Sequence, residues 1–361
     1  MSSISGRKDW IDFARAIGIF CIAYGHLVQG ESVVSQYFGS FRVAIFFLIM
    51  GLTFSIKDSF FCFLKKKVFR LLIPYAFFSV VSIIAFYFFA IIMPSLTDGK
   101  TNNILIYFWG AIYGNGLTGN MKWNLPLWFL PCSFVTLLLV YGYEKLLMGL
   151  KLNKLLFRIV YFFVSASICF VYICFIKNAK LPFGAEVAIS MSGFVELGIV
   201  LSKIDSFKKK YLYGLICIPL IICGYCLCRI NGVVSVMSLN FGSNYVIYYI
   251  SSVASIVGII CLSIWLCSFE LLKSINRIAC YCGKHTIAIL CMHKFPILFF
   301  QLIVPYTKVL FRSESGSVQK DVLGILVTIV VIALCLIVEL PINRFLPQVL
   351  GNSNKQKGVA S

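Results

Sequence analysis

The chain has 361 residues, of which 60% are hydrophobic and only 12% are charged. A soluble domain of this size would carry about twice that charged fraction, so the composition predicts an integral membrane protein. The net charge of +19 comes from Lys and Arg residues between apolar runs, as membrane topology requires, and we therefore expect no nucleic-acid partner.

Apolar runs predict an all-α, polytopic membrane protein with about ten transmembrane helices. One helical bundle accounts for residues 1–350, and we expect a short polar cytoplasmic tail at 351–361. The predicted spans, in chain order, are 10–29, 37–55, 71–93, 126–147, 156–176, 183–202, 211–230, 245–268, 285–304 and 321–341.

The distribution of basic residues predicts the orientation of the bundle. With the N-terminus in the cytoplasm, most Lys and Arg residues of the connecting segments, including the cluster at 65–70, fall on the inner side. Cytoplasmic loops are enriched in these residues, so we expect both ends of the chain in the cytoplasm.

The apolar stretch 104–113 is too short to cross a bilayer and predicts a re-entrant or interfacial piece. The segment 269–284 predicts an amphipathic helix on the membrane surface.

Three polar residues share one face of the first predicted span: Asp12, Arg15 and His26. Eleven helical steps separate Arg15 from His26, which returns them to nearly the same face with a rise of about 16 Å. Polar groups are costly in lipid, so this face should meet protein or water. Arginine suits a phosphate or carboxylate, and histidine can take and return a proton near neutral pH. Alternatively, Asp12 and Arg15 form a structural ion pair and His26 is a hydrogen-bonded core residue.

His293 is the other histidine deep within a predicted span. Pro296 follows it, and a proline inside a helix frees a backbone carbonyl and kinks the helix, as in segments that line cavities. We therefore treat His293 as a candidate catalytic residue, although a structural role is equally consistent with the pattern.

Other polar and aromatic residues are candidates for binding an acceptor substrate: Glu186, Glu196, Arg42 and Trp128. Either glutamate could orient a histidine or bind sugar hydroxyls, or could instead pair with Arg42 or Lys294 for stability. The position of Trp128 favours an aromatic belt at the outer boundary over stacking on a sugar. The sequence has no phosphate loop, zinc signature or nucleophile elbow, so we expect no metal and no covalent Ser or Cys.

Four stretches of the chain resemble the membrane-bound acyltransferase type 3 family, in its short form without an extracellular domain. The first, RKDWIDFARAIGIFCIAYGHL, carries the family's pattern of Arg, ten residues and His as Arg15 and His26, with Asp12 in place. The second, FRVAIFFLIMGLTFS, is similar to a Phe-rich segment, but Met50-Gly51-Leu52 departs from its Ser-Gly-Tyr ending. The third and fourth are LPLWFLPCSFV and GKHTIAILCMHKFP.

The resemblance implies transfer of an acyl group, most often acetyl, from cytoplasmic acyl-CoA to a hydroxyl of a cell-surface glycan or its lipid-linked precursor. The location it implies is the bacterial cytoplasmic (inner) membrane. His26 and Arg15 then carry the family's catalytic pattern, with His26 as general base or, alternatively, as a nucleophile. Asp12 would hold Arg15. We expect the phosphates of acyl-CoA to meet basic residues, namely Arg15, Lys66, Lys67 and Arg70.

The rival interpretation is a lipid-linked sugar flippase or a polysaccharide polymerase without acyl chemistry. Such proteins also have many spans and basic inner loops, and they would use the buried charges as a substrate path. The spacing of Arg15 and His26 and the lack of visible internal repeats argue against it.

Overall fold

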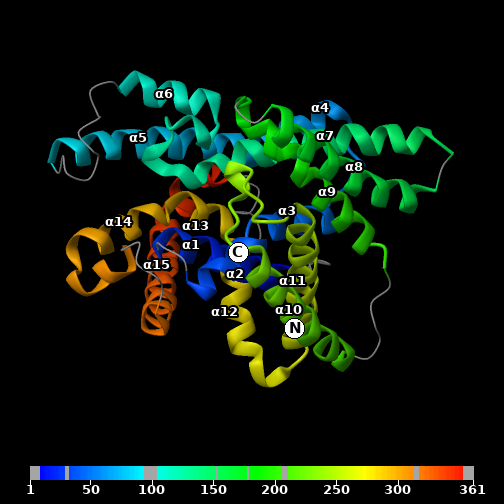
Figure 1. Ribbon diagram of the computed structural model, residues 1–361. Helices are drawn as coiled ribbons and strands as arrows, with labels where there is room; N and C mark the ends of the chain where they lie inside the picture. Colours follow the sequence, from blue (N-terminus) through cyan, green and yellow to red (C-terminus); the bar gives the residue numbers. More distant parts are fainter. Residues whose placement is uncertain are drawn as a thin grey trace, which may run out of the picture.

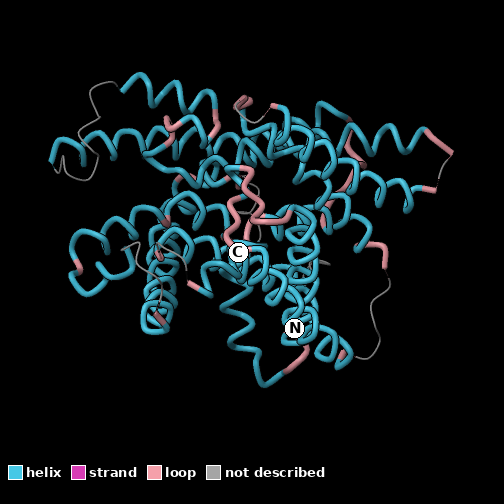
Figure 2. Tube along the Cα trace, viewed as in Figure 1, coloured by secondary structure: helices cyan, strands magenta, loops and turns pink. Residues whose placement is uncertain are grey.

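Helices make up most of the described part of the chain in the computed structural model. The structure describes residues 9–28, 32–92, 104–151, 153–176, 179–204, 210–311 and 317–352. Within these ranges there is no β-strand, only an isolated bridge between Ser235 and Asn240, and most loops are short (Figure 2). Of the predicted polar tail, residues 353–361 lie outside the described residues.

Eight helical segments of the described chain are long and apolar enough to cross a membrane. They confirm the prediction of an all-α, polytopic membrane protein. In chain order they are α2–α3 (Val33–Phe41 and Ala44–Leu52), α4–α5 (Phe60–Lys67 and Ile73–Ile92, joined by the π-helical turn Val68–Leu72), η4–α7 (Lys122–Trp128 and Phe129–Gly149), α8 (Lys154–Phe175), η5–α9 (Pro182–Gly184 and Ala185–Leu201), α10 (Tyr211–Asn231), α11 (Tyr245–Leu266) and α15 (Val318–Phe345).

The other two predicted spans are also helical, but they are not among the eight long apolar segments. The first is α1 (Asp9–Leu27), and the ninth is divided into α13 (Thr286–Met292) and α14 (Lys294–Ile303). Helix α1 contacts α3, α11, α12, α13 and α15, so it lies at the centre of the bundle (Figure 1). This central position gives Asp12 and Arg15 protein neighbours instead of lipid.

Two short helices appear where the sequence predicts them: α6 (Ile104–Tyr113) and α12 (Lys273–Lys284). Helix α12 crosses the beginning of α1 so closely that a Cβ atom on Gly283 would stand 1.7 Å from the carbonyl oxygen of Asp12. Ile275 and Ile278 of α12 remain exposed, and contact of α12 with the membrane surface stays a prediction.

Small residues bring the inner helices together. In α9, 78% of the most apolar stretch is buried, against 22% in α8, so α9 is an inner helix and α8 an outer one. Gly51 of α3 and Gly198 of α9 face each other: Cβ atoms there would stand 1.9 Å from the carbonyl oxygen of Val195 and 2.0 Å from that of Leu48. Small residues allow such close approach of membrane helices. Gly51 is the central residue of Met50-Gly51-Leu52, the segment whose flanking residues differ from Ser-Gly-Tyr. The close contact between α3 and α9 requires a glycine at this position.

Two predicted spans are broken near residues of interest. The span 285–304 ends one helix at Met292 and begins another at Lys294, because Pro296 has no N–H to donate to the carbonyl of Met292. The kink predicted there is confirmed. The span predicted as continuous over 37–55 is also broken, at Arg42 and Val43, and no Pro announces this break. The breaks place Arg42 and His293 at the junctions between helical segments inside the protein.

Candidate active site

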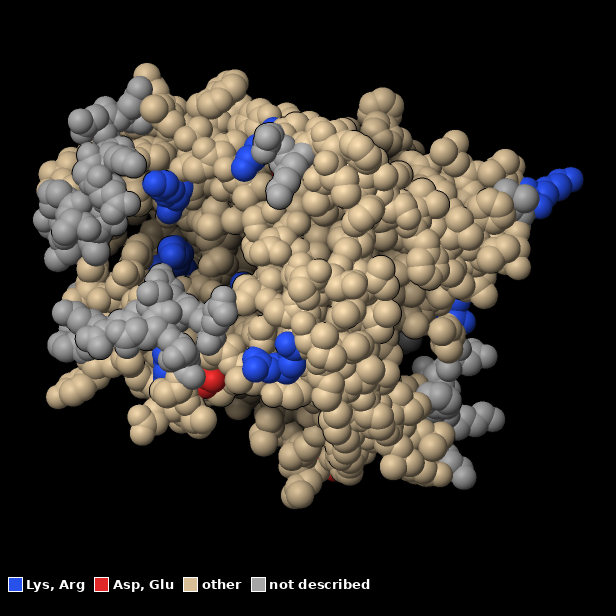
Figure 3. Space-filling view, viewed as in Figure 1, with Lys and Arg blue, Asp and Glu red and all other residues tan. Residues whose placement is uncertain are grey.

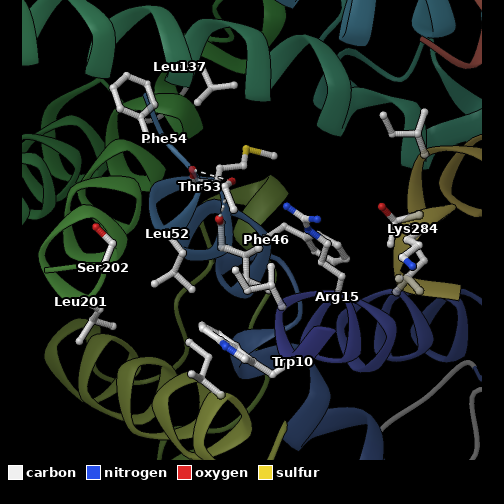
Figure 4. A pocket seen from close by; sticks show the side chains of 18 of the residues that line it. Trp10, Arg15, Phe46, Leu52, Thr53, Phe54, Leu137, Leu201, Ser202 and Lys284 are labelled. Carbon is white, nitrogen blue, oxygen red and sulfur yellow. Dashed lines mark hydrogen bonds between the residues drawn. The ribbon is translucent and has the colours of Figure 1, made fainter. Parts of the chain in front are cut away.

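A cavity of about 730 Å³ opens between α1, α3, α7, α11 and α12. Its wall is largely apolar, and no acidic residue of the described chain lines it. Figure 4 shows Arg15 and Lys284 on one side of this space and Leu201 and Ser202 on the opposite side. Four basic residues line it: Arg15, Lys67, Arg70 and Lys284. We call this space the basic cavity; its size is that of a ligand pocket and its charge suits an anion.

Arg15 is held at the wall of the basic cavity by Asp12. Its Nη1 atom lies 3.0 Å from Oδ1 of Asp12, whose side chain is fully buried. One turn of α1 separates the two residues, so the helix itself sets the geometry of the pair. The expectation that Asp12 holds Arg15 is therefore consistent with the contact, and the guanidinium still faces the cavity.

Lys66 is not part of the basic cavity, contrary to our expectation for a residue that binds acyl-CoA. Its Nζ atom lies 2.8 and 2.9 Å from the carboxylate oxygens of Asp58 on the surface. The hydrogen bond from Lys66 lowers the pKa of the Asp58 carboxyl below its ordinary value. Successive residues of a helix point about 100° apart, which turns Lys67 into the cavity and Lys66 away from it.

His26 and His293 come together from opposite ends of the sequence. Their ring centroids are 5.3 Å apart. His26 is half-buried near the end of α1, whereas His293 is fully buried at the break between α13 and α14. Nδ1 of His293 donates to the carbonyl oxygen of Ile289 at 2.9 Å. Nε2 of the neutral ring then keeps its lone pair, and no described residue is bonded to it.

Arg42 lies beside this histidine pair. A Cβ atom on Gly25, the residue before His26, would stand 1.2 Å from Nη1 of Arg42. That nitrogen is buried and has no hydrogen-bond partner among the described residues. Two imidazoles and a guanidinium with an unused donor thus lie in one region of the bundle. A base and an oxyanion donor are the groups that an acyl transfer to a hydroxyl uses.

The histidine pair lies between the basic cavity and a second, smaller one. Ile22 and Leu290, one turn before His26 and three residues before His293, line the basic cavity. The second cavity, of about 210 Å³, is lined by Lys294, which directly follows His293. Neither histidine lines either cavity. Arg15 and His26 therefore do not line one continuous space, and Ile22 and Leu290 lie at the boundary of the basic cavity toward the histidines.

Glu186 and Trp128 line neither of the two cavities. Glu186 accepts hydrogen bonds from Nδ2 of Asn115 at 2.6 Å and from the backbone N–H of Leu181 at 3.2 Å, and so ties two loops together. It pairs with neither Arg42 nor Lys294. Trp128 is buried at the start of α7 and lines neither cavity. The structure thus supports neither residue as an acceptor-binding group, and the burial of Trp128 also argues against its place in an aromatic belt.

Glu196 belongs to a structural cluster. Arg158 donates from Nε and Nη2 to both carboxylate oxygens of Glu144, at 2.6 and 2.8 Å, and its Nε lies 3.8 Å from Oε2 of Glu196. The three residues come from α7, α8 and α9. Of the alternatives for Glu196, pairing with Arg42 or Lys294 is not found: its cationic neighbour is Arg158, which lies on a different helix.

Sequence reasoning missed Asn124, which positions the backbone beside His293. Its Nδ2 donates to Oγ of Ser82 at 3.0 Å and to the carbonyl oxygen of Cys291 at 2.9 Å. Asn124 is fully buried. The sequence did contain a signal: Asn124 is a polar amide among apolar residues just before Pro126, and such a group must find hydrogen-bond partners inside the protein.

Among the described residues, no group of His, Cys, Asp or Glu side chains converges in a way that could hold a metal ion.

The fold and this site define a polytopic membrane protein with two histidines and an arginine inside the helical bundle. A family model described as an acyltransferase domain matches residues 8–344, nearly the whole chain. The chain therefore belongs to the acyltransferase 3 family, as the four stretches predicted, and it is a membrane acyltransferase. Comparison with curated proteins and with solved structures found no match. The family match favours acyl transfer over the flippase or polymerase interpretation.

Proposed function

We propose that this acyltransferase moves an acetyl group from cytoplasmic acetyl-CoA to a hydroxyl of a cell-surface polysaccharide or of its lipid-linked precursor, in a bacterial cytoplasmic membrane. The observation that carries the proposal is the pair His26 and His293, 5.3 Å apart between a basic cavity and a second cavity. A donor and an acceptor that enter from the two cavities would meet at this pair.

The basic cavity suits the donor. Coenzyme A carries several phosphates, and the cavity presents Arg15, Lys67, Arg70 and Lys284 without a carboxylate among its described lining residues. Charged hydrogen bonds to phosphate are about twice as strong as neutral ones. From Arg15 to His26 the helix rises about 16 Å, a distance that the extended pantetheine arm can follow along α1. Passage of the thioester past Ile22 and Leu290 then requires a rearrangement of these two flexible apolar side chains.

The chemistry follows from the groups beside the thioester. His26 takes the proton of the acceptor hydroxyl while the oxygen attacks the thioester carbonyl carbon, and the carbonyl oxygen becomes negatively charged. The unused Nη1 donor of Arg42 stabilises that oxygen. The C–S bond then breaks, and the CoA thiolate takes the proton back from His26. Nε2 of His293 can accept a hydrogen bond from His26 and so orient its ring. A route through an acetyl-His26 intermediate would use the same residues.

The test is acetyl transfer by purified protein in lipid nanodiscs. His26→Ala should lower transfer by about 10²- to 10⁴-fold, the usual contribution of a general base, while acetyl-CoA still binds. Arg15→Ala should instead weaken the binding of acetyl-CoA. Lys66→Ala is the matched control, because Lys66 pairs with Asp58 outside the cavity. Full transfer by His26→Ala would contradict the proposal, and movement of a lipid-linked sugar without consumption of acetyl-CoA would favour the rival class.

A further inference from the structure

The second cavity is lined by lysines and aromatic residues. It lies between α5, η4 and α14, and it is lined by Ser82, Phe89, Lys122, Trp123, Lys294 and Gln301, among others. Figure 3 shows the surface hollowed beside α5 and α14, with Lys and Arg side chains around the opening. The aromatic faces of Phe89 and Trp123, together with the amide of Gln301, are groups that pack on and hydrogen-bond to a sugar ring.

Two lysines line this cavity, and no carboxylate is among its described lining residues. Lys122 lies in η4 and Lys294 begins α14. Neither lysine forms a hydrogen bond or an ion pair with a described residue. Lys294 is half-buried, and Lys122 is exposed at the opening. A half-buried ammonium in a membrane protein is costly unless an anion accompanies it, so the cavity is suited to a negatively charged occupant.

Chain neighbours and hydrogen bonds connect the lining of this cavity to His293. Lys294 follows His293 in the chain, and Ser82, which lines the cavity, accepts the hydrogen bond from Asn124. Asn124 in turn holds the carbonyl of Cys291, two residues before His293. An occupant that engages Lys294 therefore lies beside the reacting groups and on the side away from the basic cavity.

We propose that this cavity binds the acceptor and that the acceptor carries an acidic group, a sugar carboxylate or a phosphate, which Lys122 and Lys294 hold. This inference depends on the proposed function, since it names the substrate class of the same site. A neutral glycan would leave both ammonium groups without a partner, whereas an acidic glycan compensates them and is fixed with a hydroxyl toward His26.

The test compares three probes that share a ring and an aromatic aglycone. They are p-nitrophenyl β-D-glucuronide, p-nitrophenyl β-D-glucoside 6-phosphate and the neutral p-nitrophenyl β-D-glucoside. Their binding to the full-length protein in phosphatidylcholine nanodiscs is measured by equilibrium dialysis. At least one charged probe should bind at least tenfold more tightly than the neutral one, and the probe that does so distinguishes carboxylate from phosphate. The double variant Lys122→Gln, Lys294→Gln should lose this preference, while Lys180→Gln, which removes an exposed charge outside the cavity, should keep it.

The proposal is overturned by equal affinity for all probes, by no binding of any probe, or by a charge preference that persists in the double variant. Loss of charged-probe binding when phosphatidylglycerol is added to the nanodiscs would also overturn it, because the cavity would then hold a lipid headgroup. Binding and consumption of acetyl-CoA are measured on the same preparations. If acetyl-CoA is consumed without a charge preference, only the acidic acceptor fails; if charged probes bind but acetyl-CoA does not, the acyl transfer itself fails.

Discussion

Gly25 lies directly beneath the guanidinium of Arg42. A Cβ atom on Gly25 would stand 1.2 Å from Nη1 of Arg42, closer than any nonbonded contact allows. The absence of a side chain at Gly25 therefore lets Arg42, which enters from the break between α2 and α3, lie against α1 one residue before His26. Close packing fixes this cation near His26, since Arg42 forms no ion pair with a described residue.

Replacement of Gly25 by Ala should displace Arg42 and lower the maximal rate of acetyl transfer by about 10²-fold, the usual cost of losing one oxyanion donor. The KM for acetyl-CoA should change little, because the basic cavity is untouched. Both constants are measured in nanodiscs. Gly142→Ala in α7 is the control, since a Cβ there meets no atom within 4 Å. A normal rate for Gly25→Ala would show that Arg42 does not act at this position.

Lys66 and Lys67 are neighbours with opposite expected roles. Lys67→Ala removes a cation from the basic cavity and should raise the KM for acetyl-CoA about tenfold, because a hydrogen bond to a charged group contributes about 1.5–3 kcal/mol. Lys66→Ala removes a surface pair with Asp58 and should leave the KM unchanged. Initial rates of acetyl transfer at varied acetyl-CoA concentration check the KM of both variants. Equal effects of the two substitutions would argue that the cavity is not the donor site.

Pro296 maintains the break between α13 and α14 at His293. Pro296→Ala restores the missing N–H, so the helix can close its hydrogen bond to Met292 and straighten. His293 would then rotate away from His26, and the transfer rate should fall by about tenfold or more, as expected when catalytic groups shift by about 1 Å. Cross-linking between Cys residues placed at 26 and 293, in otherwise matched proteins with and without Pro296, measures the separation. Unchanged cross-linking would contradict this account.

A substitution at the contact between α3 and α9 should change the stability of the protein. Gly198→Ala puts a methyl group 2.0 Å from the carbonyl oxygen of Leu48, so α3 and α9 must separate. Overpacking of this kind costs about 1–3 kcal/mol, which a lowered midpoint of thermal unfolding in detergent would show. Gly149→Ala, where a Cβ meets no atom within 4 Å, should not lower the midpoint. Equal midpoints for both variants would show that the α3–α9 approach is looser than described.

Patterns within one helix were predictable. The spacing of Asp12 and Arg15 predicted their pairing because an interval of three residues returns to the same face of a helix. The kink near His293 was predictable because Pro296 acts on the hydrogen bonds of its own helix. The family itself could be read from Arg15 and His26 together with three further stretches.

Contacts between distant segments were decided by the tertiary structure alone. The sequence offered Arg42 and Lys294 as partners for Glu196, but packing of α7, α8 and α9 gave it Arg158. Nothing local indicated that Gly25 would admit Arg42, or that Lys294 would line a second cavity. Hydropathy and helical periodicity act over a few residues, so they determined the spans and the polar face of α1. Which faces meet depends on the fit of side chains far apart in the chain, and that fit created the site.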